Sequence, residues 1–194
     1  MVRLYRRAGG EFLVNSTTEG NQSSLRFVPL SDGGFLAFWV SPDGSDLGLR
    51  GQRFDSAGGR VGVEFSVNTI TTGQQALPSA VLLSTGSVLV GWWDESNADG
   101  DGSAGDIRGQ IFDSTGAPSG SELLLVQIPV STLSAKSVPA LGALPGGGFI
   151  MAWTQDDPAG PDTSGVSIKA RIYDSSGTAA SGLISVNTTT FAGQ

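Results

Sequence analysis

The chain of 194 residues contains no cysteine and no histidine. The missing cysteine excludes disulfides, thiolate nucleophiles and cysteine-bound zinc. The missing histidine excludes catalytic triads with an imidazole base, so proton transfer near neutral pH would depend on carboxylates. Basic residues are also few, because 11 Lys and Arg stand against 18 Asp and Glu, for a net charge of −7. This charge argues against nucleic acid as a partner, since nucleic-acid binding needs clustered Lys and Arg.

Long apolar runs are missing as well. No run reaches the roughly 18 residues of a membrane-spanning helix, and no segment resembles a secretory signal peptide. We therefore expect no membrane span. Glycine, in contrast, is abundant, with 29 Gly beside 9 Pro. Such frequent turn residues favour short strands joined by tight turns.

Three degenerate copies of one segment fill the chain. The run GQRFDSAG at 51–58 returns as GQIFDSTG at 109–116 and as ARIYDSSG at 170–177. The copies cover about 11–63, 64–121 and 122–182 of a single repeat domain at 1–194, and a fourth copy begins at 183–194. A second landmark pairs an asparagine with a glutamine seven residues later, at 15 and 22, at 68 and 75, and at 187 and 194. A period of about sixty residues indicates a propeller, a solenoid or an array.

Each copy predicts four short strands. In the first copy we expect them at 25–30, 35–40, 48–55 and 63–67, and in the second at 80–83, 88–93, 106–113 and 123–126. The second strand of the first copy, FLAFW, is apolar throughout, so both of its faces should be covered. Four short antiparallel strands with one of them buried on both faces describe a propeller blade. The prediction is an all-β chain of three β-propeller blades, with a β-sandwich or a β-solenoid as the rival folds.

Three blades are too few to close a propeller, because rings use about four to eight. An open array would leave the apolar faces of its first and last blades in water, and soluble monomers rarely tolerate such patches. We therefore expect a homodimer through the terminal blades that forms a six-bladed ring. The extra FLVN at 12–15 or the ISVN at 184–187 would supply an outer strand across the joint.

The repeated DSxG sites at Asp55, Asp113 and Asp174 have a simple structural explanation. Asp at the start of a turn and Gly three residues later suit a type I turn that closes a hairpin with a glycine bulge. We expect these sites to be turns and not ligand sites.

The whole set of landmarks resembles a known kind of repeat. The series EFxVN, TTxGxQ, LxxGGFxxxW, an acidic loop and GQRFDxxG resembles the propeller-type repeats of about sixty residues in large secreted bacterial proteins. It resembles more distantly the calcium-loop propeller repeats of integrin heads. The resemblance implies a secreted or cell-surface bacterial location, and neighbouring modules that bind calcium or mediate adhesion.

The loops between the second and third strands hold most of the acidic residues, at 41–46, 94–106 and 155–165. In the second copy Asn97, Asp99 and Asp101 alternate, and Asp106 could complete a calcium site of oxygen ligands. Arg108 stands where an EF-type loop needs a glutamate, so the match is partial. The alternative is a solvated loop whose charge is balanced by the cation at the same place in every copy.

Aromatic residues and paired carboxylates offer two further kinds of site. The repeated tryptophans Trp39, Trp92 and Trp153 lie in apolar runs and are expected between blades. Trp93 must face the other way, so we predict that it is exposed and binds a ligand such as a glycan. The adjacent acidic pairs at 94–95 and 156–157 could hydrolyse glycosides, although neighbours on a strand point apart.

These observations favour a non-enzymatic structural or binding module of a secreted or surface bacterial protein, with adhesion as its use. The alternative is a lectin that binds glycans through aromatics at the blade edge, and a glycoside-active enzyme ranks third. A glycan or another protein is the expected ligand, and calcium the expected cofactor.

Overall fold

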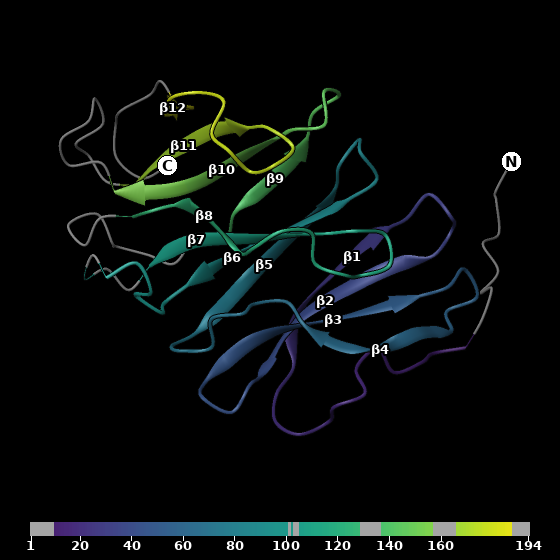
Figure 1. Cartoon of the computed structure of the whole chain (residues 1–194). Coiled ribbons are helices and arrows are strands. Elements are labelled where there is room, and N and C mark those ends of the chain that lie inside the picture. The colour runs from purple at the N-terminus through teal and green to yellow at the C-terminus, as the bar shows by residue number, and fades with distance from the viewer. Residues whose placement is uncertain (1–9, 101, 103–104, 129–136, 157–165, 188–194) are drawn as a thin grey trace, which may run out of the picture.

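The computed structural model describes residues 10–100, 102, 105–128, 137–156 and 166–187. The described chain is all-β and consists of three four-stranded antiparallel sheets, with no helix among these residues (Figure 1). Each sheet takes four strands that follow one another in the chain. The first sheet contains β1 (Ser23–Pro29), β2 (Phe35–Pro42), β3 (Leu47–Phe54) and β4 (Arg60–Ser66). The second contains β5 (Gln75–Leu82), β6 (Val88–Asp94), β7 (Asp106–Phe112) and β8 (Leu123–Val126), and the third β9 (Ala140–Ala143), β10 (Phe149–Asp156), β11 (Val166–Tyr173) and β12 (Ile184–Ser185).

This arrangement confirms the all-β prediction and the number of four-stranded units. The strands of the first two sheets begin and end within a few residues of the predicted ranges, except β5, which starts at Gln75 and so extends further towards the N-terminus. The fourth strands reach past the expected copy limits, since β8 and β12 lie in what the sequence assigns to the following copy. Among the described residues no helix is long and apolar enough to span a membrane.

The DSxG sites are turns, as the sequence predicts. The Oδ1 atom of Asp55 accepts hydrogen bonds from the backbone amides of Ala57 at 2.9 Å and Gly59 at 2.8 Å. Gly58 between them has φ +83°, which strains any residue with a Cβ. The same bonds recur around Asp113 and Asp174. These residues therefore close the hairpins between the third and fourth strands.

The three sheets pack face to face, and the middle strands carry the core. Alternate residues of β6 point in opposite directions. Val88, Val90 and Trp92 pack with the first sheet, whereas Leu89 and Trp93 pack with the third. Every residue of β6 and of β7 is buried, as expected for a sheet covered on both faces. Two interfaces result, and we call them the first joint, between the first and second sheets, and the second joint, between the second and third.

The Asn–Gln landmark is a latch at the first joint. Asn68 is 4% exposed, and its Nδ2 donates to Oε1 of Gln75 at 3.0 Å and to the carbonyl of Ile70 at 2.7 Å. Its Oδ1 accepts from the amide of Leu49 at 2.7 Å. The latch therefore fixes the connector that leads from β4 to β5. Asn15 and Gln22 make the corresponding side-chain bond at 3.0 Å.

The segment at 12–15 covers part of the outer face of the first sheet. Phe12 lies 5.6 Å from Phe54 between ring centroids, and Val14 packs on the cluster of Ala37, Trp39 and Phe54. At the first joint, Phe65 of β4 lies 5.6 Å from Phe112 in the same way. The segment 12–15 therefore occupies the place that the fourth strand of a preceding sheet would take.

Candidate functional site

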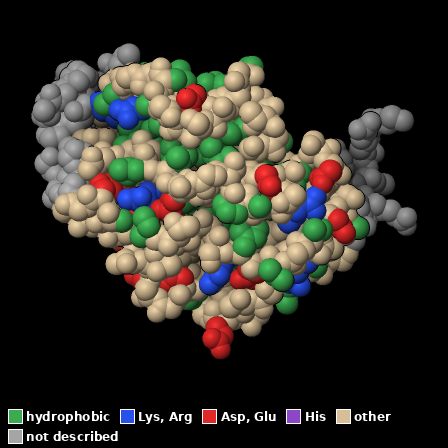
Figure 2. Space-filling model, viewed as in Figure 1, with side chains coloured by type: hydrophobic (Ala, Val, Ile, Leu, Met, Phe, Trp, Pro, Cys, Tyr) green, Lys and Arg blue, Asp and Glu red, His purple; other side chains and the backbone are tan. Residues whose placement is uncertain are grey.

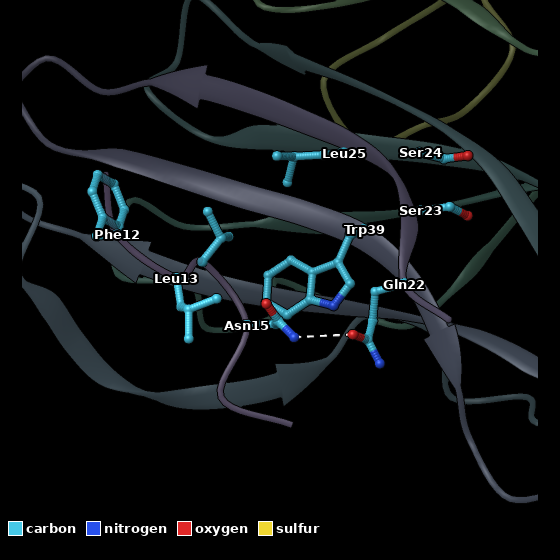
Figure 3. A pocket seen from close by; sticks show the side chains of 9 residues that line it. Phe12, Leu13, Asn15, Gln22, Ser23, Ser24, Leu25 and Trp39 are labelled. Carbon is cyan, nitrogen blue, oxygen red and sulfur yellow. Dashed lines mark hydrogen bonds between the residues drawn. The ribbon is translucent and has the colours of Figure 1, made fainter. Parts of the chain in front are cut away.

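An apolar groove opens beside this N-terminal segment (Figure 3). Its volume is about 280 Å³, and Trp39 of β2 lies between its two walls. One wall is the segment 12–15, and the other is residues 22–25 at the start of β1. The hydrogen bond between Asn15 and Gln22 joins the two walls at one end, as the dashed line in Figure 3 shows. The groove thus combines an indole with amide and hydroxyl groups.

Trp39 itself is only 3% exposed, and its indole Nε1 has no hydrogen-bond partner. An unpaired buried donor can indicate a missing ligand. However, Trp92 has the same place in the second sheet, and its Nε1 is also unpaired although the first joint covers it completely. An unpaired N–H thus also occurs at a tryptophan that another sheet covers, so it does not identify a ligand site at Trp39; in the third sheet, Nε1 of Trp153 donates to Gln155 at 3.0 Å.

A buried polar network in the second sheet is the second candidate. Nε of Arg108 donates to Oδ2 of Asp94 at 2.7 Å, and Nε2 of Gln75 donates to Oδ1 of the same carboxylate at 3.0 Å. Nη1 of Arg108 lies 3.7 Å from Oε1 of Glu122. At the corresponding two positions the first sheet has Ser41 with an arginine, and the third has glutamine with a lysine.

Glu122 also holds the connector of the first joint. Its Oε2 accepts hydrogen bonds from the amide and the hydroxyl of Thr69, both at 2.8 Å. Glu64 binds Ser16 in the same manner, at 2.9 Å to the amide and 2.7 Å to the hydroxyl. Although partial burial opposes the effect, these bonds from Ser16 hold the pKa of Glu64 below its ordinary value. Glu122 therefore stabilises the first joint, Glu64 fixes the N-terminal segment, and both glutamates are used within the protein.

The loop with the predicted calcium ligands is engaged in hydrogen bonds of its own. Oδ1 of Asn97 accepts from the amide of Gly102 at 2.9 Å, and Oδ2 of Asp99 accepts from Nε2 of Gln127 at 2.8 Å. Asp106 is buried, and its Oδ1 accepts from the amide of Ile128 at 3.0 Å. Asp101 lies outside the described residues. No cluster of three acidic side chains that could hold a metal occurs in the described part of the chain, and calcium binding stays a prediction.

Trp93 is not exposed, contrary to the prediction. Only 1% of its surface is accessible, because the face of β6 opposite Trp92 packs on the third sheet. Its Nε1 donates to Oε1 of Glu95 at 3.1 Å. All four tryptophans are at most 3% exposed, so none of them offers an open face to a sugar ring.

The acidic pair at 94–95 does not converge on a shared point. Asp94 binds Arg108, whereas Glu95 accepts from Trp93. A different pair was not found from the sequence: Asp94 and Asp106 are direct cross-strand partners, and both are buried at 1% exposure. The sequence contained a signal for this pair, because Asp94 ends the second strand of the copy and Asp106 begins the third, which places them opposite each other in a hairpin. Asp157 of the second adjacent pair lies outside the described residues.

No protein-family model matches the chain, and no curated protein sequence is similar to it. Two solved structures from Bacteroides thetaiotaomicron share its fold. An endo-arabinase matches 90% of this chain with a TM-score of 0.55 at 17% identity, and an endo-1,4-beta-xylanase matches 88% with a TM-score of 0.53 at 11% identity. The chain spans 66% of the first protein and 55% of the second.

These comparisons correct the expectation that the chain is not an enzyme. These two structures are an endo-arabinase and an endo-1,4-beta-xylanase, so the fold also occurs in enzymes. The absence of histidine and cysteine does not argue against an enzyme of this kind, because glycoside hydrolysis depends on carboxylates. The identity of 17% or less shows the shared fold alone.

Proposed function

We propose that the chain is a propeller-type module that binds carbohydrate at the end of the sheets where the acidic loops lie. The observation that carries the proposal is the fold shared with the endo-arabinase and the endo-1,4-beta-xylanase over at least 88% of this chain. The prediction of a glycan-binding protein was the alternative from the sequence, and it agrees with these neighbours better than a purely structural module does. Secretion, a place at a bacterial surface and adhesion belong to the proposal as consequences of the resemblance.

The polar end of the sheets provides suitable chemistry. In an antiparallel meander the loops alternate between two ends, so the loops after each second strand and the connectors between sheets share one end. The hydroxyl of Ser45, in the loop before β3, donates to the carbonyl of Thr71 in the connector before β5, which brings the two together. Asp46, Thr72 and Asn97 at this end are exposed. Carboxylate, hydroxyl and amide groups bind sugar hydroxyls by hydrogen bonds.

The burial of the tryptophans argues against carbohydrate binding by stacking on their rings. A lectin that stacks sugars on aromatic faces needs an exposed ring, and no tryptophan provides one. Recognition therefore depends on the polar groups of the loops. This predicts weak affinity for single sugars and stronger binding of oligosaccharides that contact loops of several sheets.

Calorimetric titration with arabino-oligosaccharides and xylo-oligosaccharides tests the proposal. We expect binding that weakens at least fivefold when Asp46 and Asn97 are both replaced by alanine. Ser56→Ala, which changes an exposed residue in the turn at the opposite end, is the matched control and should leave the affinity unchanged. Release of reducing ends in the same samples measures hydrolysis. No heat with either sugar class at millimolar concentration would refute the proposal.

A further inference from the structure

We propose that the free face of the third sheet packs on the groove at Trp39 of a second copy of the chain. This inference concerns assembly, and it is independent of the carbohydrate proposal. The two internal joints show what covers each face of a sheet, so they also show what is missing at the two outer faces.

The face that the first sheet presents to the first joint is fully covered. Leu36, Phe38, Val40, Leu49 and Val67 form it, and all are at most 2% exposed. Their counterparts in the second sheet include Leu89, Trp93, Ile107 and Val126, at most 6% exposed at the second joint.

The corresponding face of the third sheet is open. At the places of Leu49 and Val67 it carries Ile168, which is 38% exposed, and Val186, which is 50% exposed. Thr154 stands at the place of Val40 and is exposed. Figure 2 shows hydrophobic side chains gathered on the surface over the elements of the third sheet, in the upper half of the view. The corresponding faces of the first and second sheets are both covered, at the first and second joints.

The groove at Trp39 is the other half of the same interface. In the second sheet, Trp92 at this place is covered by a cluster that includes Phe38, Val40 and Leu49 of the first sheet. Around Trp39, the segment 12–15 provides the counterparts of Phe65 and Val67, which are Phe12 and Val14, but the described residues provide no counterpart of Phe38, Val40 or Leu49. The groove is therefore the space that the side chains of a preceding sheet would fill. At those places the free face of the third sheet carries the smaller Ala152 and Thr154 beside Ile168, and we infer that the third sheet of a second copy packs there.

At this joint, the segment 12–15 of one copy and β12 of the other would occupy the same place, that of the fourth strand. Arg60 holds the segment 12–15 by donating to the carbonyls of Leu13 at 2.7 Å and Asn15 at 2.9 Å. β12, in contrast, pairs with β11 through only two residue pairs, and Ile184 is 38% exposed. At the joint, the segment 12–15 of one copy would pair with β11 of the partner in place of β12. Two such joints related by a twofold axis close a ring of six sheets, within the usual range of about four to eight for propellers.

Light scattering after size exclusion of the full chain at 5 to 100 µM tests this assembly. We expect twice the chain mass of 19.8 kDa. Ile168→Glu on one half of the joint and Leu13→Glu on the other should each produce monomers with an unchanged circular dichroism spectrum. Val63→Glu is the matched control, because Val63 is 82% exposed on β4 of the first sheet and faces neither half of the joint, so it should remain dimeric.

The results that would overturn the proposed dimer are as follows. A monomeric wild type at 100 µM overturns the proposal and leaves the face for another partner. A dimer that survives both Ile168→Glu and Leu13→Glu overturns it as well. If Ile168→Glu does not fold, Thr154→Glu, at an exposed residue of β10 on the same face, replaces it. A mass that grows continuously with concentration would keep the contact but refute the closed ring.

Discussion

Replacing Arg108 by methionine removes the one cation of the buried network in the second sheet. Arg108 is 7% exposed and Asp94 is 1% exposed, so the ion pair is removed from water. Asp94 keeps its bonds from Gln75 at 3.0 Å and from the hydroxyl of Ser96 at 2.5 Å, but it loses its counter-ion. Removing one partner of a buried ion pair destabilises a protein by about 3 to 5 kcal/mol. We expect Arg108→Met to fall in this range.

The third sheet supplies the matched control. Gln155 and Lys169 stand there at the positions of Asp94 and Arg108, and Lys169 is 4% exposed with its Nζ 3.2 Å from the hydroxyl of Ser185. The double variant Asp94→Gln with Arg108→Lys therefore installs a pair that this fold already accepts. We expect it to lose less than about 2 kcal/mol, with a coupling energy between the two positions of about 0.5 to 3 kcal/mol.

Urea unfolding at pH 7, followed by tryptophan fluorescence, measures these differences. The four variants of a double-mutant cycle share the same buried tryptophans, so the signal change is the same in each. A loss below about 1 kcal/mol for Arg108→Met would refute the reasoning, because the buried carboxylates would then not depend on the guanidinium. Additive effects of Asp94→Gln and Arg108→Lys would refute it as well, because the two side chains would then not interact.

Three further outcomes are expected. Asn68→Ala should cost about 2 to 4 kcal/mol in urea unfolding, because it leaves the amide of Leu49 without its acceptor, whereas the partly buried Asn15→Ala should cost about 1 kcal/mol or less. Asp113 has its pKa held below the ordinary value chiefly by the Thr115 hydroxyl, so its contribution to stability is present above the unfolded pKa and is lost as the pH falls through the folded one. Asp113→Asn should therefore flatten the acid limb of a stability profile. Calcium at a hundred times its dissociation constant should add about 2.7 kcal/mol, and a melting temperature equal in calcium and in chelator, for wild type and Asp99→Ala, would contradict the calcium prediction.

The strands and turns could be predicted from the sequence because their causes are local. Asp55 needs only its own carboxylate and a glycine three residues on to close a turn, so three occurrences of DSxG identify three hairpins. The strands β2 and β6 could be recognised as buried on both faces from their apolar runs, whereas β10, with the similar run FIMAW, is partly exposed on one face. The spacing of Asn68 and Gln75 was also visible, although its role as a latch required the side-chain geometry.

Trp93 and Asp94 could not be placed in this way, because their burial depends on the neighbouring sheet. Alternation gives opposite faces to Trp92 and Trp93, and the sequence interpretation gave one of these faces to solvent. In a stack of sheets the opposite face is another interface, so Trp93 is as buried as Trp92. An acidic residue beside a glycine-rich loop likewise suggests solvent, whereas Asp94 lies at 1% exposure beside Arg108.

The joints combine recurring apolar residues with polar ones that differ between the sheets. Valine recurs at Val67, Val126 and Val186, whereas the place of Phe38 is taken by Gly91 and Ala152 in the other two sheets. The polar positions differ, with Ser41 in the first sheet, Asp94 in the second and Gln155 in the third. The partners of Asp94, which are Gln75, Ser96 and Arg108, belong to the second sheet and the loop after β6. The buried carboxylate is therefore compensated within its own sheet, and the expected loss in Arg108→Met is a loss of stability in that sheet.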